Sequence, residues 1–219
     1  MKVRQYLVIG AGRFGSAVST NLHQFGHEVV VLDRNEATIE AIMHQVTHAL
    51  IADATDEAAL GSLGVRNFDA AIVAIGVNFQ ATVLATTLLK NLGAKYVVSK
   101  AADRLTAEVL SRVGADRVVR PEHDMGVQLA RQFAEPNVLE SFDFGTGHEV
   151  LELMARKPLI GSLRDLQLPT RFRVHVAAVE RDSQVELNPV ADYEVAAGDK
   201  LAIIGSRESL NKLRAWLGS

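Results

Sequence analysis

The sequence contains no cysteine, which excludes disulfide bonds and thiolate metal sites and gives no argument for an oxidising compartment. No apolar run approaches the roughly 20 residues that a membrane helix needs, so a role at a membrane would have to run through a partner. The apolar residues 6–10 are too few for the hydrophobic region of a signal peptide, and no small-residue cleavage site follows them. We therefore expect a cytoplasmic protein.

The sequence also lacks a large excess of charge of either sign. Its formal net charge of −3 gives no general attraction to nucleic acid, so we expect no nucleic-acid partner. Hydrophobic residues make up 48% and charged residues 22% of the chain, as in soluble proteins that bury a core. A length of 219 residues fits one large domain or a domain with a smaller one, and we favour the second arrangement.

Short apolar runs alternate with helical patterns up to about residue 120. Six runs have the character of strands: YLVIG, VVVLD, HALIA, AAIVAIG, KYVVSK and DRVVRP. Between them apolar residues recur at helical spacing, as Phe14, Val18 and Leu22 do. Gly64 and Gly114 each follow such a run, as glycines at helix C-termini do. The alternation predicts an α/β fold with a doubly wound, Rossmann-like parallel sheet.

The later part of the chain changes character because strands now follow one another closely. The segments EVLELMA, RVHVAAVE, QVELN and KLAIIG predict strands, with helices at residues 162–166 and 207–217. A further helix is expected over residues 121–133, and we place the domain boundary after it, continuing through residue 147. We therefore predict two domains: a nucleotide-binding domain over residues 1–135 and a small α+β module over residues 136–219.

The segment Gly10-Ala11-Gly12-Arg13-Phe14-Gly15 follows the first strand and opens a helix, which is the context that a dinucleotide-binding glycine motif requires. The first glycine allows the tight turn, the second lets the backbone approach a pyrophosphate, and the third lets the helix pack closely on the strand. Free amides and the helix dipole at this N-terminus favour phosphates. The alternative is a glycine turn that binds nothing.

The second strand ends in Asp33, where a carboxylate can accept hydrogen bonds from both ribose hydroxyls and would repel a 2′-phosphate. NADP is therefore disfavoured, while ATP, ADP and NAD all remain open. In the alternative interpretation, Asp33 is an ordinary helix cap.

Further candidates follow the carboxyl ends of the other strands, where ligands bind in open α/β sheets. Asp53 would meet the base or ribose and Lys100 a phosphate; alternatively, Asp53 is a turn residue, Asn78 a helix cap and Lys100 a solvated strand end. The full predicted nucleotide-binding set is Gly10, Gly12, Arg13, Phe14, Gly15, Asp33, Arg34, Asp53, Ala54, Gly76, Asn78 and Lys100.

Two charged side chains suggest contacts with terminal phosphates. Arg13 stands inside the glycine loop and could clamp a phosphate bidentately, although a solvent-exposed arginine is the alternative. Glu122 follows Pro121 at a helix start, where it would either reach a divalent cation, Mg²⁺ or Ca²⁺, bound to the phosphates or simply suit the helix dipole.

No reaction centre accompanies this binding motif. Tyr96 and Lys100 match a spacing used by short-chain dehydrogenases, but a strand would place them about 13 Å apart, so we treat the match as coincidence. No nucleophile elbow or catalytic histidine arrangement is present. We expect a sensor without enzymatic activity. The alternatives are an NAD-dependent oxidoreductase and a redox-sensing gene regulator, which would need a DNA-binding module that the sequence does not show.

Taken together, the motifs VIGAGRFGSAV, GHEVVVLDRN, LGVRNFDAAIVAIG, GADRVVRPEHDMG and GDKLAIIG resemble the RCK (regulator of potassium conductance) proteins, most closely the cytosolic KtrA and TrkA subunits of bacterial potassium uptake systems. The resemblance covers essentially the whole chain. It implies dimers that assemble into an octameric ring on a KtrB- or TrkH-like membrane subunit that translocates potassium.

The resemblance also implies ligands and residue roles. ATP would activate and ADP inactivate, with Asp33 on the ribose, Arg13 near a terminal phosphate and Glu122 on an activating cation. Cyclic di-AMP is implied as an inhibitor bound by the C-terminal module, at residues that the resemblance does not assign. The family also contains NAD/NADH responders, and Asp53 within IADATD is similar to their pattern.

Overall fold

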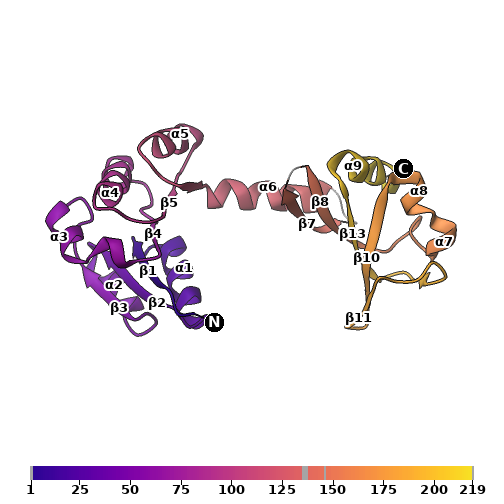
Figure 1. The fold of residues 1–219 in the computed structure, drawn as a ribbon, viewed down its shortest axis with the longest axis horizontal. Helices are drawn as coiled ribbons and strands as arrows, with labels where there is room; N and C mark the ends of the chain where they lie inside the picture. The colour runs from indigo at the N-terminus through magenta and orange to yellow at the C-terminus, as the bar shows by residue number, and fades with distance from the viewer. Residues whose placement is uncertain (1, 135–137, 146, 219) are drawn as a thin grey trace. The chain divides into compact units, whose positions relative to one another are not determined.

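The computed structural model describes residues 2–134, 138–145 and 147–218, and it divides into two compact units, residues 1–125 and 126–219 (Figure 1). The division falls inside helix α6 (Pro121–Ala134). The boundary expected after residue 135 lies outside the described residues, so the predicted domain limits remain a prediction. Each unit is described by itself.

The first unit contains a parallel sheet with the strand order β3-β2-β1-β4-β5-β6. Its strands are β1 (Gln5–Ile9), β2 (Glu28–Asp33), β3 (His48–Ile51), β4 (Ala70–Val73), β5 (Val97–Lys100) and β6 (Arg117–Val119). Its helices are α1 (Arg13–Gln24), α2 (Glu36–Ile42), α3 (Glu57–Ser62), the short 3₁₀ helix η1 (Val65–Asn67), α4 (Phe79–Asn91) and α5 (Arg104–Arg112). This arrangement confirms the predicted doubly wound, Rossmann-like fold.

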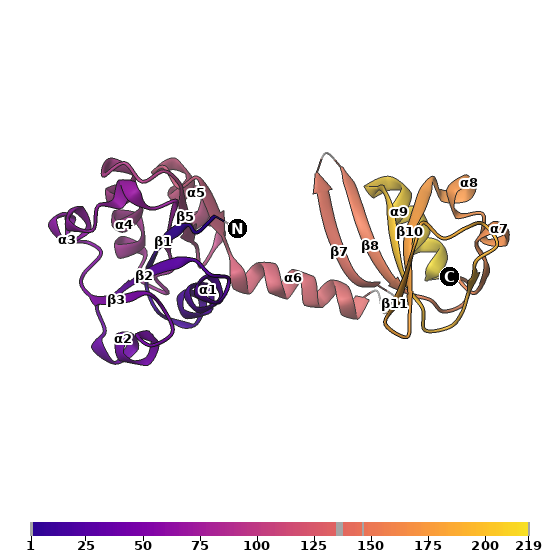
Figure 2. The ribbon, with the colours of Figure 1, turned by 60° about the horizontal axis from the view of Figure 1, so that its bottom comes forward.

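The central strands β1, β2 and β4 are mostly buried on both faces of the sheet, which explains why they are continuous apolar runs. The edge strand β3 is largely exposed. Alternate residues of β1 point to opposite faces, so Leu7 and Ile9 pack in one core while Val8 packs in the other. Helices α1 and α2 cover one face, and α4 and α5 lie on the other (Figure 2). After α3 and α5, Gly64 and Gly114 adopt φ values of 65° and 106°, which confirms the predicted helix C-terminal turns.

The second unit is built on an antiparallel sheet with the order β11-β10-β13-β8-β7. These strands are β7 (Val138–Gly145), β8 (His148–Met154), β10 (Val174–Arg181), β11 (Gln184–Leu187) and β13 (Lys200–Ser206). A two-stranded sheet joins β9 (Gly161–Ser162) to β12 (Glu194–Val195), and the helices are α7 (Leu163–Leu166), α8 (Leu168–Phe172) and α9 (Arg207–Leu217). The predicted α+β module is confirmed.

No strand was predicted over residues 138–145, but these residues form β7 and pair with β8. The sequence of β7, VLESFDFG, has one β-branched residue and three polar residues, so its strand signal is weak despite its two phenylalanines. The short helix α8 was also missed, since Pro169 begins a turn as readily as a helix.

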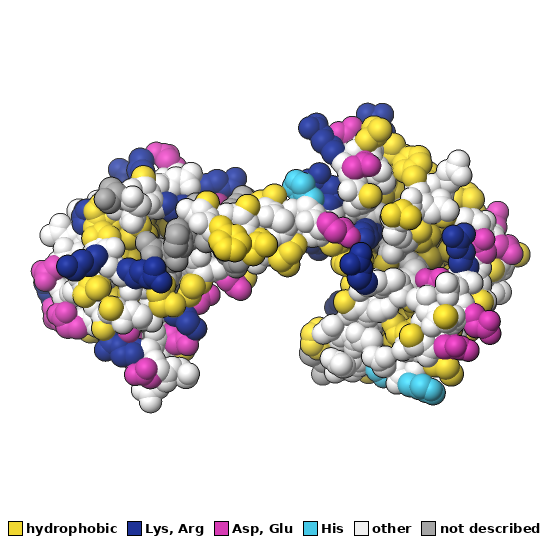
Figure 3. All heavy atoms as spheres, turned by 180° about the vertical axis from the view of Figure 1, so that it is seen from behind, with side chains coloured by type: hydrophobic (Ala, Val, Ile, Leu, Met, Phe, Trp, Pro, Cys, Tyr) yellow, Lys and Arg dark blue, Asp and Glu magenta, His cyan; other side chains and the backbone are white. Residues whose placement is uncertain are grey.

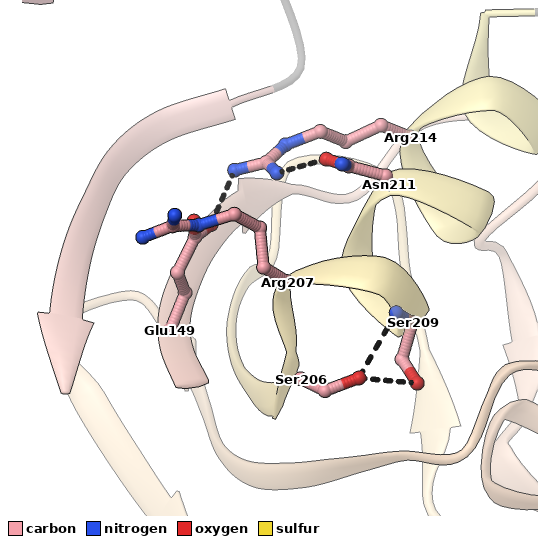
Figure 4. A network of polar contacts seen from close by, with 6 residues as sticks. All are labelled: Glu149, Ser206, Arg207, Ser209, Asn211 and Arg214. Atoms are coloured by element: carbon pink, nitrogen blue, oxygen red, sulfur yellow. Dashed lines mark hydrogen bonds and ion pairs between the residues drawn. The ribbon is translucent and has the colours of Figure 1, made fainter. Parts of the chain in front are cut away.

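Helix α9 is fixed to the sheet by an ion-pair network as well as by its apolar face (Figure 4). Glu149 at the start of β8 is buried, with 7% of its surface exposed. Its carboxylate accepts hydrogen bonds from Arg207 Nε at 2.8 Å and from an Arg214 terminal nitrogen at 3.1 Å. Ser206 caps the helix by accepting from the Ser209 amide at 3.2 Å.

Within the described residues, no helix combines the length and apolar character that crossing a bilayer requires. Helix α6 nevertheless exposes a series of apolar side chains (Figure 3). These are Met125, Val127, Leu129 and Phe133, which are between 39% and 79% exposed.

Candidate functional site

The first unit contains a cavity of about 900 Å³ at the carboxyl ends of its strands. It lies at the loops that follow β1 and β4, neighbouring strands at which the strand order reverses, which is where open α/β sheets bind their ligands. Ligand pockets commonly measure about 300–1,000 Å³, so the cavity has the size for a nucleotide. We refer to it as the crevice.

All but one of the predicted binding residues line the crevice. Gly15 is the exception, since it lies behind the glycine loop and packs against the sheet. The residues that line it as predicted are Gly10, Gly12, Arg13, Phe14, Asp33, Arg34, Asp53, Ala54, Gly76, Asn78, Lys100 and Glu122. Their individual contacts with a ligand remain predictions.

Part of the crevice wall was not predicted from the sequence. The missed residues include Thr55, Val77, Gln80, Ala81, Leu84 and Ala102. Several belong to the first turns of α4, and the rule that loops after parallel strands face the ligand could have found them.

The three glycines of the loop differ in what their surroundings allow. Gly10 has φ +95°, and a Cβ there would lie 3.0 Å from the backbone of Ala74, so only glycine fits this turn. A Cβ on Gly15 would collide with the carbonyl oxygen of Gly10, so α1 can lie close to β1 only without one. Gly12 has an ordinary φ of −66°, and a Cβ there would meet no described atom within 4 Å.

Gly12 therefore provides a backbone surface that is open to the crevice, which is the feature that a bound pyrophosphate requires. It is also the N-cap of α1, and no side chain there accepts a hydrogen bond from the helix amides. The first turn of α1 carries no acidic residue, so its dipole and amides can act on an anionic ligand.

Asp33 connects the glycine loop to the second strand. One carboxylate oxygen accepts a hydrogen bond from the Ala11 amide at 2.8 Å, and the other accepts from the Asn35 amide at 2.9 Å. Each oxygen of an ionised carboxylate has two acceptor positions. Asp33 can therefore hold the loop in place and still accept from ribose hydroxyls.

Asp53 and Asn78 are both fixed by local hydrogen bonds. Oδ1 of Asp53 accepts from the Thr55 amide at 2.8 Å and from the Thr55 hydroxyl at 2.7 Å, and these bonds lower the pKa of Asp53 below its usual value. Asn78 caps α4 by accepting from the Ala81 amide at 3.0 Å. The turn and cap interpretations of these residues hold, and both residues also line the crevice.

Lys100 and Glu122 form an ion pair in the crevice, with Nζ and Oε1 separated by 2.7 Å. The side chain of Lys100 is only 12% exposed, whereas that of Glu122 is 70% exposed. The ammonium of Lys100 also lies 5.9 Å from the centroid of the Phe14 ring. Lys100 is therefore not a solvated strand end. The hydrogen bond from Lys100, with a smaller effect of the Arg13 charge, lowers the pKa of Glu122.

The described residues contain no group of three or more His, Cys, Asp or Glu side chains that could hold a metal ion. A divalent cation in the crevice would have Glu122 as its carboxylate ligand there and would take its other ligands from phosphates and water, as Mg²⁺ commonly does. Glu122 would first have to leave Lys100.

The residues that follow Tyr96, Val97–Lys100, form strand β5 and not a helix. The spacing between Tyr96 and Lys100 is therefore the coincidence that we expected.

The fold and the crevice define a Rossmann-type domain of the nucleotide-binding class, followed by a small antiparallel module. Comparison with known families refines this class. The TrkA-N domain model matches residues 6–121, and the TrkA-C domain model matches residues 155–218. The chain belongs to the TrkA/Ktr family, as its motifs predicted.

Several relatives match over almost their entire lengths. Ktr system potassium uptake protein A of Bacillus subtilis is 38% identical over 213 residues, which cover 97% of this chain and 96% of the relative. The protein of the same name from Vibrio alginolyticus is 35% identical over 214 residues, which cover 97% of both chains.

Solved structures share the fold at lower identity. The GsuK channel bound to NAD superposes with a TM-score of 0.68 at 15% identity, covering 100% of this chain and 40% of the channel. GsuK bound to ADP gives a TM-score of 0.53 at 18% identity and covers 61% of this chain and 36% of the channel. The chain therefore spans less than half the length of this channel.

Proposed function

We propose that this protein is a nucleotide-sensing regulatory subunit of a potassium uptake system, without enzymatic activity of its own. The observation that carries the proposal is a nucleotide-sized crevice, lined by the glycine loop and Asp33, in a chain whose full-length relatives are Ktr potassium uptake proteins. The protein would act in the cytoplasm, at the inner face of the membrane, through a KtrB- or TrkH-like subunit that translocates potassium.

The ligand we propose is an adenine nucleotide, with ATP favouring the active state and ADP the inactive state. A ligand can shift a conformational equilibrium only by its differential affinity for the two states. The γ-phosphate supplies such a difference because it adds charge that Arg13, or a cation held by Glu122, would contact. NAD(H) is the alternative ligand, since GsuK has been solved with NAD as well as with ADP.

The assembly we propose is a homo-oligomer, with dimers forming an octameric ring. It is supported by the apolar side chains that α6 leaves exposed, because exposed apolar patches often mark surfaces that a partner covers. Cyclic di-AMP is a proposed inhibitor bound by the C-terminal unit.

The proposal is tested by measuring potassium flux through the membrane subunit in vesicles reconstituted with this protein. We expect ATP to increase the flux over ADP, and we expect a Gly12→Val variant to abolish the difference. Valine is tolerated by the fold because Gly12 has an ordinary φ and open space around it, yet its side chain would occupy the crevice. A flux that ignores all of ATP, ADP and NADH would refute the proposal, while a response to NADH alone would assign the alternative ligand.

A further inference from the structure

In the crevice, the ammonium of Lys100 is paired with a carboxylate of the protein itself, that of Glu122. Both residues line the cavity, and their charged atoms are 2.7 Å apart. A lysine at this edge of the sheet is suited to a ligand's phosphate, but here its ammonium already has a carboxylate partner.

We infer that Glu122 competes with the phosphates of the ligand for Lys100, so that nucleotide binding displaces the carboxylate and frees the first turn of α6. This inference rests on the proposed function, because it requires a phosphate-bearing ligand in the crevice. It adds an autoinhibitory contact that sets the affinity of the site.

The two partners differ in how easily they can leave the pair. The Lys100 side chain is 12% exposed and lies against the Phe14 ring, so its ammonium needs a nearby anion to offset the lost hydration. Glu122 is 70% exposed and can be hydrated once released, because an exposed carboxylate gains little from an ion pair. The exchange therefore proceeds by Glu122 leaving and phosphate replacing it.

The position of Glu122 gives this exchange a structural consequence. Glu122 lies in the first turn of α6, and the boundary between the two compact units falls within the same helix, after Met125. Ligand binding would thus change the contacts of the helix that joins the nucleotide-binding unit to the C-terminal unit.

The test measures the affinity of the full chain for ADP by calorimetry, with EDTA present to remove divalent cations. We expect Glu122→Gln to tighten ADP binding by about two- to fivefold, the range that the loss of one partly screened ion pair allows. Glu108→Gln is the matched control, because Glu108 is also ion-paired, with Arg104 at 3.0 Å, but does not line the crevice. It should leave ADP affinity unchanged.

A second pair of variants separates competition from simple repulsion between Glu122 and phosphate. In a Lys100→Met background, competition predicts that adding Glu122→Gln changes ADP affinity by less than about twofold, because the contested ammonium is gone. A tightening as large as in the wild-type background would mean repulsion alone and would overturn the inference.

The outcomes also distinguish this inference from the proposed function. If the wild-type chain binds ADP and Glu122→Gln binds it no more tightly, only the competition is refuted. If neither ADP nor NAD binds the wild-type chain, the proposed function fails and the inference fails with it.

Discussion

Replacing Asp33 by alanine separates the structural from the ligand-binding role that we assign to this carboxylate. The side chain accepts hydrogen bonds from the Ala11 and Asn35 amides at 2.8 and 2.9 Å. Losing both should lower the free energy of unfolding by about 1–3 kcal/mol, since each such bond contributes about 1 kcal/mol and the Ala11 amide, which is partly buried, would be left unpaired. We expect ADP affinity to fall by about 10- to 100-fold, because two charged-acceptor bonds to the ribose would also be lost.

Comparing the affinities for ADP and 2′-deoxy-ADP separates a lost contact with the ribose from a general disordering of the glycine loop. In the wild-type chain the deoxy analogue should bind more weakly, and in Asp33→Ala the two should bind equally, because the group that reads the hydroxyl is absent. Asp69→Ala is the control, since Asp69 also accepts from a backbone amide, that of Gln5 at 2.9 Å, outside the crevice. If Asp33→Ala discriminates between the two ligands as strongly as the wild type does, the ribose assignment is refuted.

Three further predictions concern Arg13, Gly15 and Glu149. Arg13→Ala should weaken ATP binding more than ADP binding in calorimetry, and equal losses would exclude a terminal-phosphate role. Gly15→Ala should destabilise the first unit by about 2 kcal/mol or more in chemical denaturation, because its Cβ would meet the Gly10 carbonyl; unchanged stability would contradict the close packing. Burial raises the pKa of Glu149, but hydrogen bonds from arginines outweigh it and hold that pKa below its usual 4.5. Its stabilisation is therefore complete above about pH 4.5 and is lost as pH falls through the depressed pKa, so Glu149→Gln should be less stable at neutral pH by about 1–3 kcal/mol and should lose less stability on acidification. Parallel acid profiles of variant and wild type would refute the ion-pair argument.

The first unit could be predicted from sequence because its central strands are buried on both faces and are uninterrupted apolar runs. The strands of the second unit were harder to predict from the sequence. Half-buried antiparallel strands need only every second residue to be apolar, so they contain no long apolar run. In β7 the alternation of Phe142 and Phe144 with Ser141 and Asp143 is such a pattern. It spans only four residues and runs into Gly145, which indicates a turn, so it was not assigned to a strand.

The candidate site could also be predicted only in part from the sequence. The glycine motif and the rule that strand ends face the ligand placed Asp33, Asp53 and Lys100 around one crevice. The partner of Lys100 could not be predicted, because Glu122 lies 22 residues further along the chain and belongs to a different element. A pair of this kind depends on how β5 and α6 pack, which is a tertiary property.

The central claim, that the crevice binds an adenine nucleotide, is tested most directly by the melting temperature of the purified chain with ATP, ADP, NAD or GTP. A ligand at 100 times its dissociation constant stabilises the native state by about 2.7 kcal/mol, which is several degrees for a domain of about 100 residues. We predict such an increase with ATP and ADP, or with NAD, and a smaller one with GTP. A melting temperature that none of the adenine nucleotides raises above the value with GTP would contradict the account.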